Sequence, residues 1–297
     1  MNHPEIARGI ALSVAASTLF ALLYAYTQWL APLSGMDIFA WRVIWTLPAA
    51  LLLIVWNGHG SLLVATIKQL WRHPRQLLLM FVTATLLGLQ LWLFVWAPVN
   101  GRALEVSLGY FLMPIVMVLL GRFYYRERLD LWQYLAVASA IVGILHELWM
   151  TRAFSWPTLL VALAYPPYFI LRRQMKLDSL VQFTLEMLLM MPLVLVLLWH
   201  SPTSANVLHR PDMLLLLLPG LGLLSTLALH CFLRASRLLP LGLFGILGYV
   251  EPVLLLVVSF VLLGESLGAT QLWTYGPIWL SVVFTAIHSV RLMQARK

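Results

Sequence analysis

Long apolar stretches alternate with short polar joints along nearly the whole chain. Ten of them approach or reach the roughly 20 mostly apolar residues that a helix needs to cross a bilayer. Backbone groups in lipid must be hydrogen-bonded within their own segment, which favours helices, and no stretch alternates like a membrane strand. The pattern predicts an all-α integral membrane protein with ten transmembrane helices, at residues 9–30, 38–56, 77–96, 106–123, 131–150, 156–171, 180–199, 213–232, 242–263 and 273–290.

The basic residues fit this series of helices and orient it. If both termini and every second joint face the cytoplasm, 15 of the 19 Lys and Arg residues lie on that side. Three lie on the other side, and Arg42 falls inside the second helix. Cytoplasmic loops of membrane proteins carry such an excess of positive charge. We therefore predict a multi-pass protein of the cell (inner) membrane, with both termini and the loop at residues 57–76 in the cytoplasm.

Two segments far apart in the chain share a spacing of uncommon residues. Each contains a Leu-Gly-Tyr tripeptide, then a proline, then a glutamate 13 residues after the proline. The first segment has residues 108–110, Pro114 and Glu127, and the second has residues 247–249, Pro252 and Glu265, with a one-residue slip between tripeptide and proline. This match indicates an internal repeat.

The repeat divides the chain into two halves of five helices each, residues 5–150 and 155–291. Five is an odd number of spans, so the second half enters the membrane from the opposite side. The prediction is therefore two inverted five-helix repeats. Inverted repeats provide alternating access in secondary transporters, because the same contacts can form on either side of the membrane.

Composition narrows the chemistry. The chain is 62% hydrophobic and 10% charged, with a mean hydropathy of +0.89, whereas soluble proteins carry roughly 25% charged residues. The net charge of +8 does not indicate nucleic acid as a partner, because the basic residues are spread over the joints as topology signals. One cysteine gives no disulfide framework. There is neither a phosphate-binding glycine loop nor a metal-ligand spacing, so we expect no enzyme activity, no cofactor and no metal.

Several short motifs resemble those of a known family. They are Arg42-Val43-Ile44-Trp45, Leu104-Glu105, Ser107-Leu108-Gly109-Tyr110-Phe111, Pro114, Gly121, Glu127-Arg128, Glu186 with Pro192, Gly264-Glu265 and Ile278-Trp279. The chain resembles the EamA-type drug/metabolite transporters and is similar to their RarD subfamily. Such relatives tend to carry Asn-Trp where this chain has Gln90-Leu91. The resemblance implies ten helices, two EamA repeats and a location in the cell membrane.

Polar and aromatic side chains within the spans are candidates for the substrate pathway. Arg42 can meet an anionic substrate group, or extend to the outer interface beside Asp37. Tyrosine offers an apolar ring and one hydroxyl, which suits amphipathic molecules, although each aromatic residue alone is more often part of the packing. The candidates for the substrate pathway are Arg42, Trp45, Gln90, Trp92, Tyr110, His230 and Tyr249.

Two carboxyl groups within the spans are candidates for proton coupling, Glu186 and Glu251. An ionisable group at the centre of a membrane helix costs roughly 2.5–3.5 kcal/mol on insertion scales, so such groups mark function by default. No basic residue lies within one helical turn of Glu186, so we expect burial to favour its neutral form and allow proton uptake near neutral pH. The alternative is a protonated carboxyl that only bonds two helices together.

The repeated glutamates and prolines have a structural interpretation. Glu127 and Glu265 each follow an apolar helix, and each is expected to stabilise the N-terminus of the next helix through its dipole. Pro114 and Pro252 provide points at which helices can bend.

These features favour a secondary transporter that moves small amphipathic or amino-acid-like solutes, with protons as the coupling ion. An integral membrane enzyme acting on lipids and a non-transporting scaffold or sensor are the alternatives. The expected partners are a small-molecule substrate and the lipid bilayer. Substrate identity, transport direction and a possible homodimer stay open.

Overall fold

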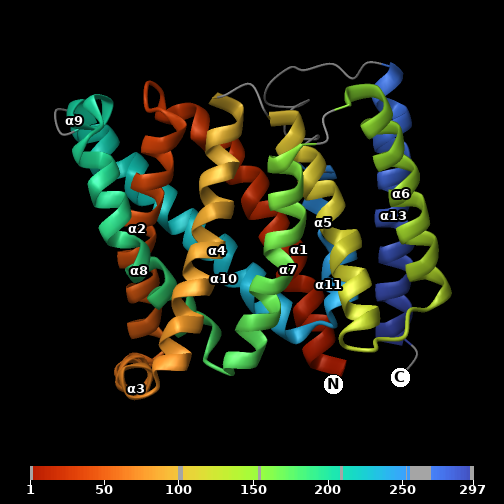
Figure 1. Ribbon diagram of the computed structural model, residues 1–297, viewed down its shortest axis with the longest axis horizontal. Helices are drawn as coiled ribbons and strands as arrows, with labels where there is room; N and C mark the ends of the chain where they lie inside the picture. Colours follow the sequence, from red (N-terminus) through yellow and green to blue (C-terminus); the bar gives the residue numbers. More distant parts are fainter. Residues whose placement is uncertain are drawn as a thin grey trace. The chain divides into compact units, whose positions relative to one another are not determined.

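The structure, a computed structural model, describes residues 3–99, 103–152, 155–207, 210–251, 253–254 and 269–294 (Figure 1). The regular elements of these ranges are helices. The α-helices are α1 (His3–Thr27), α2 (Gly35–Trp56), α3 (Gly60–Arg72), α4 (Pro74–Val99), α5 (Ala103–Phe123), α6 (Leu131–Thr151), α7 (Trp156–Met175), α8 (Ser179–Trp199), α9 (Pro202–Val207), α10 (Leu218–Leu238), α11 (Leu241–Leu247) and α13 (Ala269–Gln294). A 3₁₀ turn, η1 (Gln28–Leu30), follows α1, and a π-helical turn, η2 (Met213–Leu217), precedes α10.

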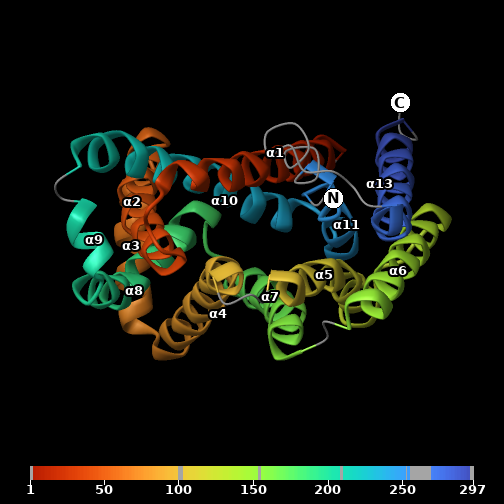
Figure 2. The same cartoon turned by 90° about the horizontal axis from the view of Figure 1, so that it is seen from above.

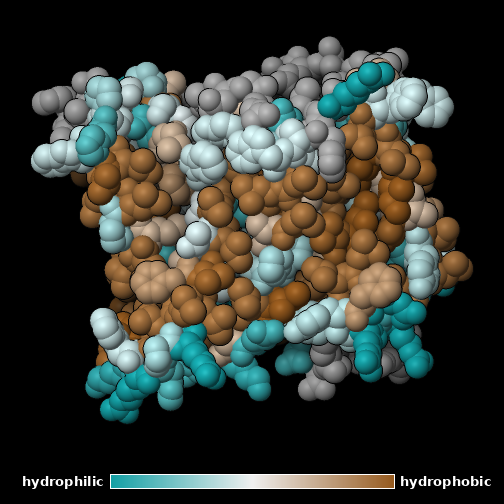
Figure 3. Space-filling view, viewed as in Figure 1, coloured by the Kyte–Doolittle hydropathy of each residue, from teal (hydrophilic) through white to brown (hydrophobic). Residues whose placement is uncertain are grey.

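Helices cover the predicted spans where the chain is described, apart from a turn at residues 248 and 249. Within the described residues, six helices are long and apolar enough to cross a membrane, and α5 adds a shorter apolar stretch, Leu108–Phe123. Figure 3 shows apolar side chains around the middle of the helices and polar ones toward their ends. The sixth span is longer than predicted, because α7 continues to Met175. The ninth begins with α11, and its residues 252 and 255–263 lie outside the described part.

Polar side chains fix where several helices begin. Ser34 caps α2, and its hydroxyl and Asp37 form a reciprocal capping box. Asp130 and Gln133 form the same arrangement at the start of α6. The carboxylate of Asp178 accepts two backbone N–H groups of α8. These caps satisfy N–H groups that have no partner within the helix.

The loop at residues 57–76 contains a helix that the span pattern did not predict. Helix α3 occupies most of this loop, and in Figure 1 it is seen end-on while α2, α4 and α8 run up the view. The joint at residues 200–212 likewise contains the short helix α9. Both were predicted as joints because they are too short and too polar to cross a bilayer.

The helices form two compact units, and each unit combines segments from both halves of the sequence. Unit 1 consists of Met1–Leu22, Ala103–Pro166 and Cys231–Lys297, and unit 2 consists of Leu23–Arg102 and Pro167–His230. Helices α1, α7 and α10 therefore contribute to both units.

Within unit 1, α6 and α13 lie side by side in both views (Figures 1 and 2). Gly143 makes this close approach possible, since a Cβ atom there would lie 2.5 Å from the carbonyl oxygen of Thr274. The hydroxyl of Ser139 donates to the carbonyl oxygen of Pro277 at 2.7 Å. Close packing at small residues and hydrogen bonds from hydroxyl groups stabilise contacts between membrane helices. The hydrophobic effect contributes little there, because lipid tails are as apolar as the side chains.

Within unit 2, α2 packs against α4, α8 and α10. Gly222 of α10 lies against the backbone of Trp45, and a Cβ atom at this glycine would come within 2.3 Å of that backbone. Gly88 of α4 gives similar room to the side chain of Met190 on α8. These close contacts bring the polar residues of the four helices into one packed interior.

Candidate functional site

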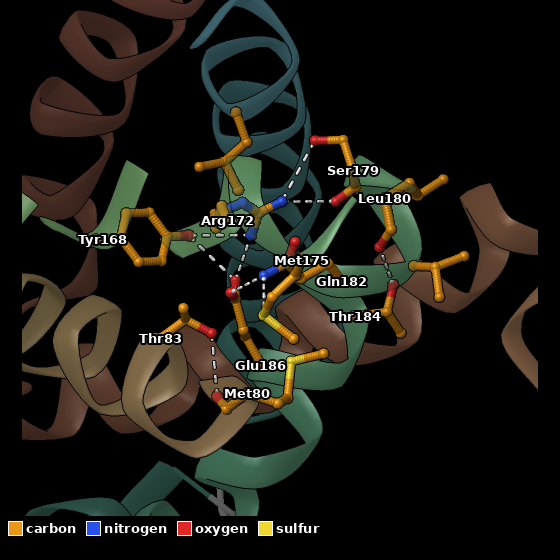
Figure 4. A network of polar contacts seen from close by, with 12 residues as sticks. Met80, Thr83, Tyr168, Arg172, Met175, Ser179, Leu180, Gln182, Thr184 and Glu186 are labelled. Atoms are coloured by element: carbon orange, nitrogen blue, oxygen red, sulfur yellow. Dashed lines mark hydrogen bonds and ion pairs between the residues drawn. The ribbon is translucent and has the colours of Figure 1, made fainter. Parts of the chain in front are cut away.

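A buried ion pair joins α7 to α8 (Figure 4). The guanidinium of Arg172 donates from Nη1 to Oε2 of Glu186 at 2.5 Å. The side chains of Arg172 and Glu186 are 1% and 0% exposed. Because both charges are withdrawn from water, each depends on its partner and on the surrounding hydrogen bonds.

Neighbouring groups add hydrogen bonds to both charges (Figure 4). The Tyr168 hydroxyl donates to Oε2 of Glu186 at 3.1 Å, and Gln182 Nε2 donates to Oε1 at 3.3 Å. The second amino group of Arg172 donates to the carbonyl oxygen of Ser179 at 2.9 Å and to its hydroxyl at 3.3 Å. The guanidinium therefore ties the last turn of α7 to the first turn of α8.

The expectation that no cation accompanies Glu186 was wrong. Arg172 lies 14 residues earlier in the sequence, on the preceding helix, so a search of one helical turn around Glu186 could not find it. The turn between α7 and α8 folds the two helices against each other and brings the charges together. In this conformation Glu186 is one partner of an ion pair. Its role in proton coupling stays a hypothesis.

Arg42 is also buried, at 4% exposure, on α2. Its Nε donates to the hydroxyl of Ser225 on α10 at 2.6 Å. Asp37 accepts hydrogen bonds from the hydroxyl of Ser34 and from the hydroxyl of Ser201, the latter at 2.5 Å. The guanidinium therefore lies in the interior of unit 2, on the contact between α2 and α10.

Arg42 and Glu186 occupy equivalent positions in α2 and α8. Each is the eighth residue of its helix, and each helix has a capping side chain at its N-cap and a proline at its fourteenth residue, Pro48 or Pro192. A rise of 1.5 Å per residue places the Cα atom of each residue about 10 Å from the start of its helix. In Figure 1, α3 follows α2 at the lower end and α9 follows α8 at the upper end, so the two helices run in opposite directions.

The other pathway candidates of unit 2 lie on α2, α4 and α10. Gln90 is 1% exposed, and the rings of Trp92 and Trp96 lie 5.2 Å apart. Trp45 is half-buried at the crossing with Gly222, and His230 is half-buried near the middle of α10.

The candidates of unit 1 are Tyr110, Tyr249 and Glu251. The ring of Tyr110 lies 6.4 Å from that of Tyr165. Tyr249 is 1% exposed within the apolar core, where its hydroxyl donates to the carbonyl oxygen of Phe111 at 3.0 Å. Glu251 is half-buried. The structure therefore uses the Tyr249 hydroxyl inside unit 1, as part of the packing between α5 and α11.

The prediction that Glu127 stabilises the N-terminus of the next helix in the sequence was wrong. Its two carboxylate oxygens accept the backbone N–H groups of Leu241 and Gly242, at 2.7 and 2.9 Å, and so cap α11 in the other half of the sequence. The next helix, α6, is capped by Asp130 instead. Two backbone donors and the helix dipole both favour a carboxylate at this position.

The remaining residues of the repeat lie beside this cap or outside the described residues. Pro114 lies in the contact of α5 with α11, where its carbonyl oxygen is 3.0 Å from the position a Cβ atom of Gly245 would take. Pro252 and Glu265 lie outside the described residues.

Sequence reasoning missed Arg172, Tyr168 and Ser225. Arg172 is one of the 15 basic residues that the predicted topology assigns to the cytoplasmic side. One usable pattern was present: Tyr168 and Arg172 are four residues apart, and so are Gln182 and Glu186. Residues four apart share one face of a helix, so two polar faces flank a short turn. Among the described residues, no cluster of three or more His, Cys, Asp or Glu side chains could hold a metal ion.

Comparison with known proteins identifies the family. The EamA-like transporter family matches residues 7–146 and 156–287, and the two matches suggest duplicated halves. The chain is 48% identical to "Chloramphenicol-sensitive protein RarD" of Pseudomonas aeruginosa over 292 residues, covering 98% of each protein. It is 29% identical to "Protein RarD" of Escherichia coli over 296 residues, covering 98% of this chain and 99% of that protein.

A solved structure has the same fold. Its title is "Crystal structure of protein", and it superposes with a TM-score of 0.69 at 17% identity, over 98% of this chain and 99% of that one. Membrane-spanning helices, a match over both halves and full-length similarity to RarD proteins agree with one another. The chain belongs to the EamA-like transporter family and is a multi-pass membrane protein.

Proposed function

We propose that this chain is a secondary transporter of the inner membrane that works by alternating access, with ten helices in two inverted halves and both termini in the cytoplasm. The two family matches cover both predicted halves. The equivalence of α2 and α8 supports the inversion, because cap, charge and proline recur at the same positions in helices that run in opposite directions. Inverted repeats of this kind give two related conformations around one central site.

The single observation that carries the coupling hypothesis is the fully buried pair of Arg172 and Glu186. An ion pair at membrane depth costs desolvation energy, and an apolar pair of similar volume would serve packing as well or better. The pair also provides two states. In one, the Glu186 carboxylate holds Arg172. In the other, a proton neutralises the carboxylate and Arg172 is free to leave, which loosens the contact between α7 and α8. Proton uptake thereby biases a conformational equilibrium.

The proposed substrate class rests on the buried positive charge of Arg42. A guanidinium buried within a membrane helix is suited to bind an anionic group of a solute. Together with the aromatic residues of α2 and α4, this favours small amphipathic or amino-acid-like solutes that carry a carboxylate. The name of the Pseudomonas aeruginosa relative mentions chloramphenicol, so this compound belongs among the solutes to test.

The test is uptake by the purified full-length chain in proteoliposomes, with and without a pH gradient, across amino acids, small amphipathic acids and chloramphenicol. We expect gradient-driven accumulation by the wild type, loss of accumulation but not of equilibrium exchange in Glu186→Gln, and normal uptake in Asp212→Asn, which alters an exposed carboxylate. The fold of each variant is checked by its unfolding transition.

Three outcomes would change the proposal. Normal accumulation by Glu186→Gln together with an inactive Glu251→Gln would move the coupling to Glu251. Full activity of both variants would rule out proton coupling through either carboxyl group. Absence of uptake of every solute by the folded wild type would contradict transport of this substrate class.

A further inference from the structure

Helix α3 lies across the direction of the helices that flank it. It begins at Gly60, four residues after α2 ends, and it ends at Arg72, two residues before α4 begins. In Figure 1 it is seen end-on beside the lower ends of α2 and α4. Because both flanking helices are apolar spans, α3 is fixed at the level where the spans leave the membrane, with its axis along the membrane surface.

One face of α3 is buried and the neighbouring face is apolar but exposed. Thr66 and Leu70 are each 4% exposed and face unit 2. Val64 and Trp71, seven residues apart and therefore on one face, are 51% and 76% exposed. Within unit 2, the described chain leaves this apolar face uncovered.

Basic side chains border the exposed apolar face. Lys68 follows Val64 by four residues and precedes Trp71 by three, so it lies between them on the helix surface. Arg72 follows Lys68 by four residues, and Arg75 stands in the first turn of α4. All three basic residues are exposed.

The end of α2, four residues before α3 begins, also exposes apolar side chains. Leu52, Val55 and Trp56 of α2 are 60%, 72% and 82% exposed. On a membrane-spanning helix, such residues face acyl chains, and tryptophan favours the level of the headgroups. The uncovered face of α3 therefore adjoins a surface that faces lipid.

We propose that α3 is a binding site for anionic phospholipids. Val64 and Trp71 enter the boundary between headgroups and acyl chains, and Lys68 and Arg72 extend along it to bind headgroup phosphates. Positive charge bordering an apolar face is complementary to a lipid that carries an acyl chain and a net negative headgroup. A zwitterionic lipid supplies the acyl chain without the net charge. Each basic residue near such a surface contributes about fivefold to the affinity for anionic lipid.

The test measures which lipid lies against α3 in the full-length chain. Val64→Cys, in a Cys231→Ser background, carries a bimane fluorophore. The protein is reconstituted in phosphatidylcholine vesicles that contain a low, equal fraction of brominated phosphatidylglycerol or brominated phosphatidylcholine. We expect severalfold stronger quenching by the brominated phosphatidylglycerol. Lys68→Gln with Arg72→Gln should abolish this preference, while quenching by brominated phosphatidylcholine stays unchanged.

A matched control removes two charges from another turn. Arg126→Gln with Arg128→Gln lowers the net charge equally and should keep the preference at α3. Equal quenching by both lipids in the parent protein would overturn the proposal, and so would an equal loss of preference in both double variants. A fluorophore quenched by neither lipid would also overturn it, because α3 would then face water or another protein.

Discussion

Removing one partner of the Arg172–Glu186 pair should destabilise the protein far more than removing both. In Glu186→Gln, the guanidinium keeps the hydroxyl of Tyr168 and both groups of Ser179 as acceptors, but it loses its only counter-charge among the contacts described above. In Arg172→Gln, the carboxylate keeps Tyr168 and Gln182 as donors and loses the cation. In the double variant, two amides can bond to each other with no net charge buried.

The magnitude follows from the burial of both side chains. Removing one partner of a buried ion pair lowers the free energy of unfolding by about 3–5 kcal/mol. Replacing both partners with uncharged residues often changes the stability little. We expect each single variant to fall in this range. The sum of the two single effects should then exceed the effect of the double variant by several kcal/mol, a coupling energy that only residues in contact produce.

The pH dependence distinguishes the two single variants. In Arg172→Gln, the remaining carboxyl can be protonated, and its neutral form is the one that burial favours. Its stability should therefore rise as pH falls and decrease as pH rises. In Glu186→Gln, the remaining guanidinium cannot lose its proton in the accessible pH range. The loss of stability of this variant, relative to the wild type, should therefore not change with pH.

The assay is equilibrium unfolding in mixed micelles, read by tryptophan fluorescence across a range of pH. The exposed pair Arg210–Asp212, with side-chain exposures of 48% and 58%, is the control, and Asp212→Asn should leave the transition unchanged. Small and additive effects of the Arg172 and Glu186 variants would refute the reasoning, because the pair would then contribute nothing that depends on both charges.

Three further predictions concern packing, capping and topology. Gly222→Ala should lower the free energy of unfolding by about 1–3 kcal/mol, because the added Cβ meets the backbone of α2. In the control Gly276→Ala, the added Cβ has no atom within 4 Å, so the unfolding midpoint should stay unchanged or rise slightly. Glu127→Gln should lower stability by about 1 kcal/mol through loss of charge at the start of α11, and an unchanged midpoint would show that the cap is dispensable. Lys68→Cys in a Cys231→Ser background should resist an impermeant thiol reagent in intact cells, and ready labelling would invert the proposed topology.

The sequence was sufficient for features that depend on local composition. The spans were predictable because crossing a bilayer requires a long apolar run, whatever the tertiary structure. The start of α2 was predictable to within a few residues, because the span was expected from residue 38 and the structure begins the helix at Gly35, after the cap of Ser34. Helix α3 was missed because a search for long apolar runs passes over a 13-residue helix whose apolar residues lie on one side.

The pairing of polar side chains was not predictable in the same way. Glu127 binds backbone groups more than a hundred residues away, and nothing near it in the sequence distinguishes that helix start from the next one. Glu186 seemed isolated because its counter-charge lies across a turn between two helices. In both cases the partner is decided by which helices pack together, and apolar residues that face lipid and apolar residues that face protein look alike in sequence.

The equivalence of Arg42 and Glu186 connects the fold to the proposed mechanism. The cap, the depth and the proline recur in α2 and α8, while the charge at the shared position is reversed. A structural need alone would favour an apolar residue there, since a charge of either sign at this depth costs several kcal/mol. Each helix instead carries an ionisable group with a different hydrogen-bond partner: Arg42 donates to the Ser225 hydroxyl, and Glu186 accepts from Arg172. Two helices that run in opposite directions thus carry a cation and an anion at matching positions along their lengths. This arrangement suits a transporter that must release the charged groups of one solute on either side of the membrane.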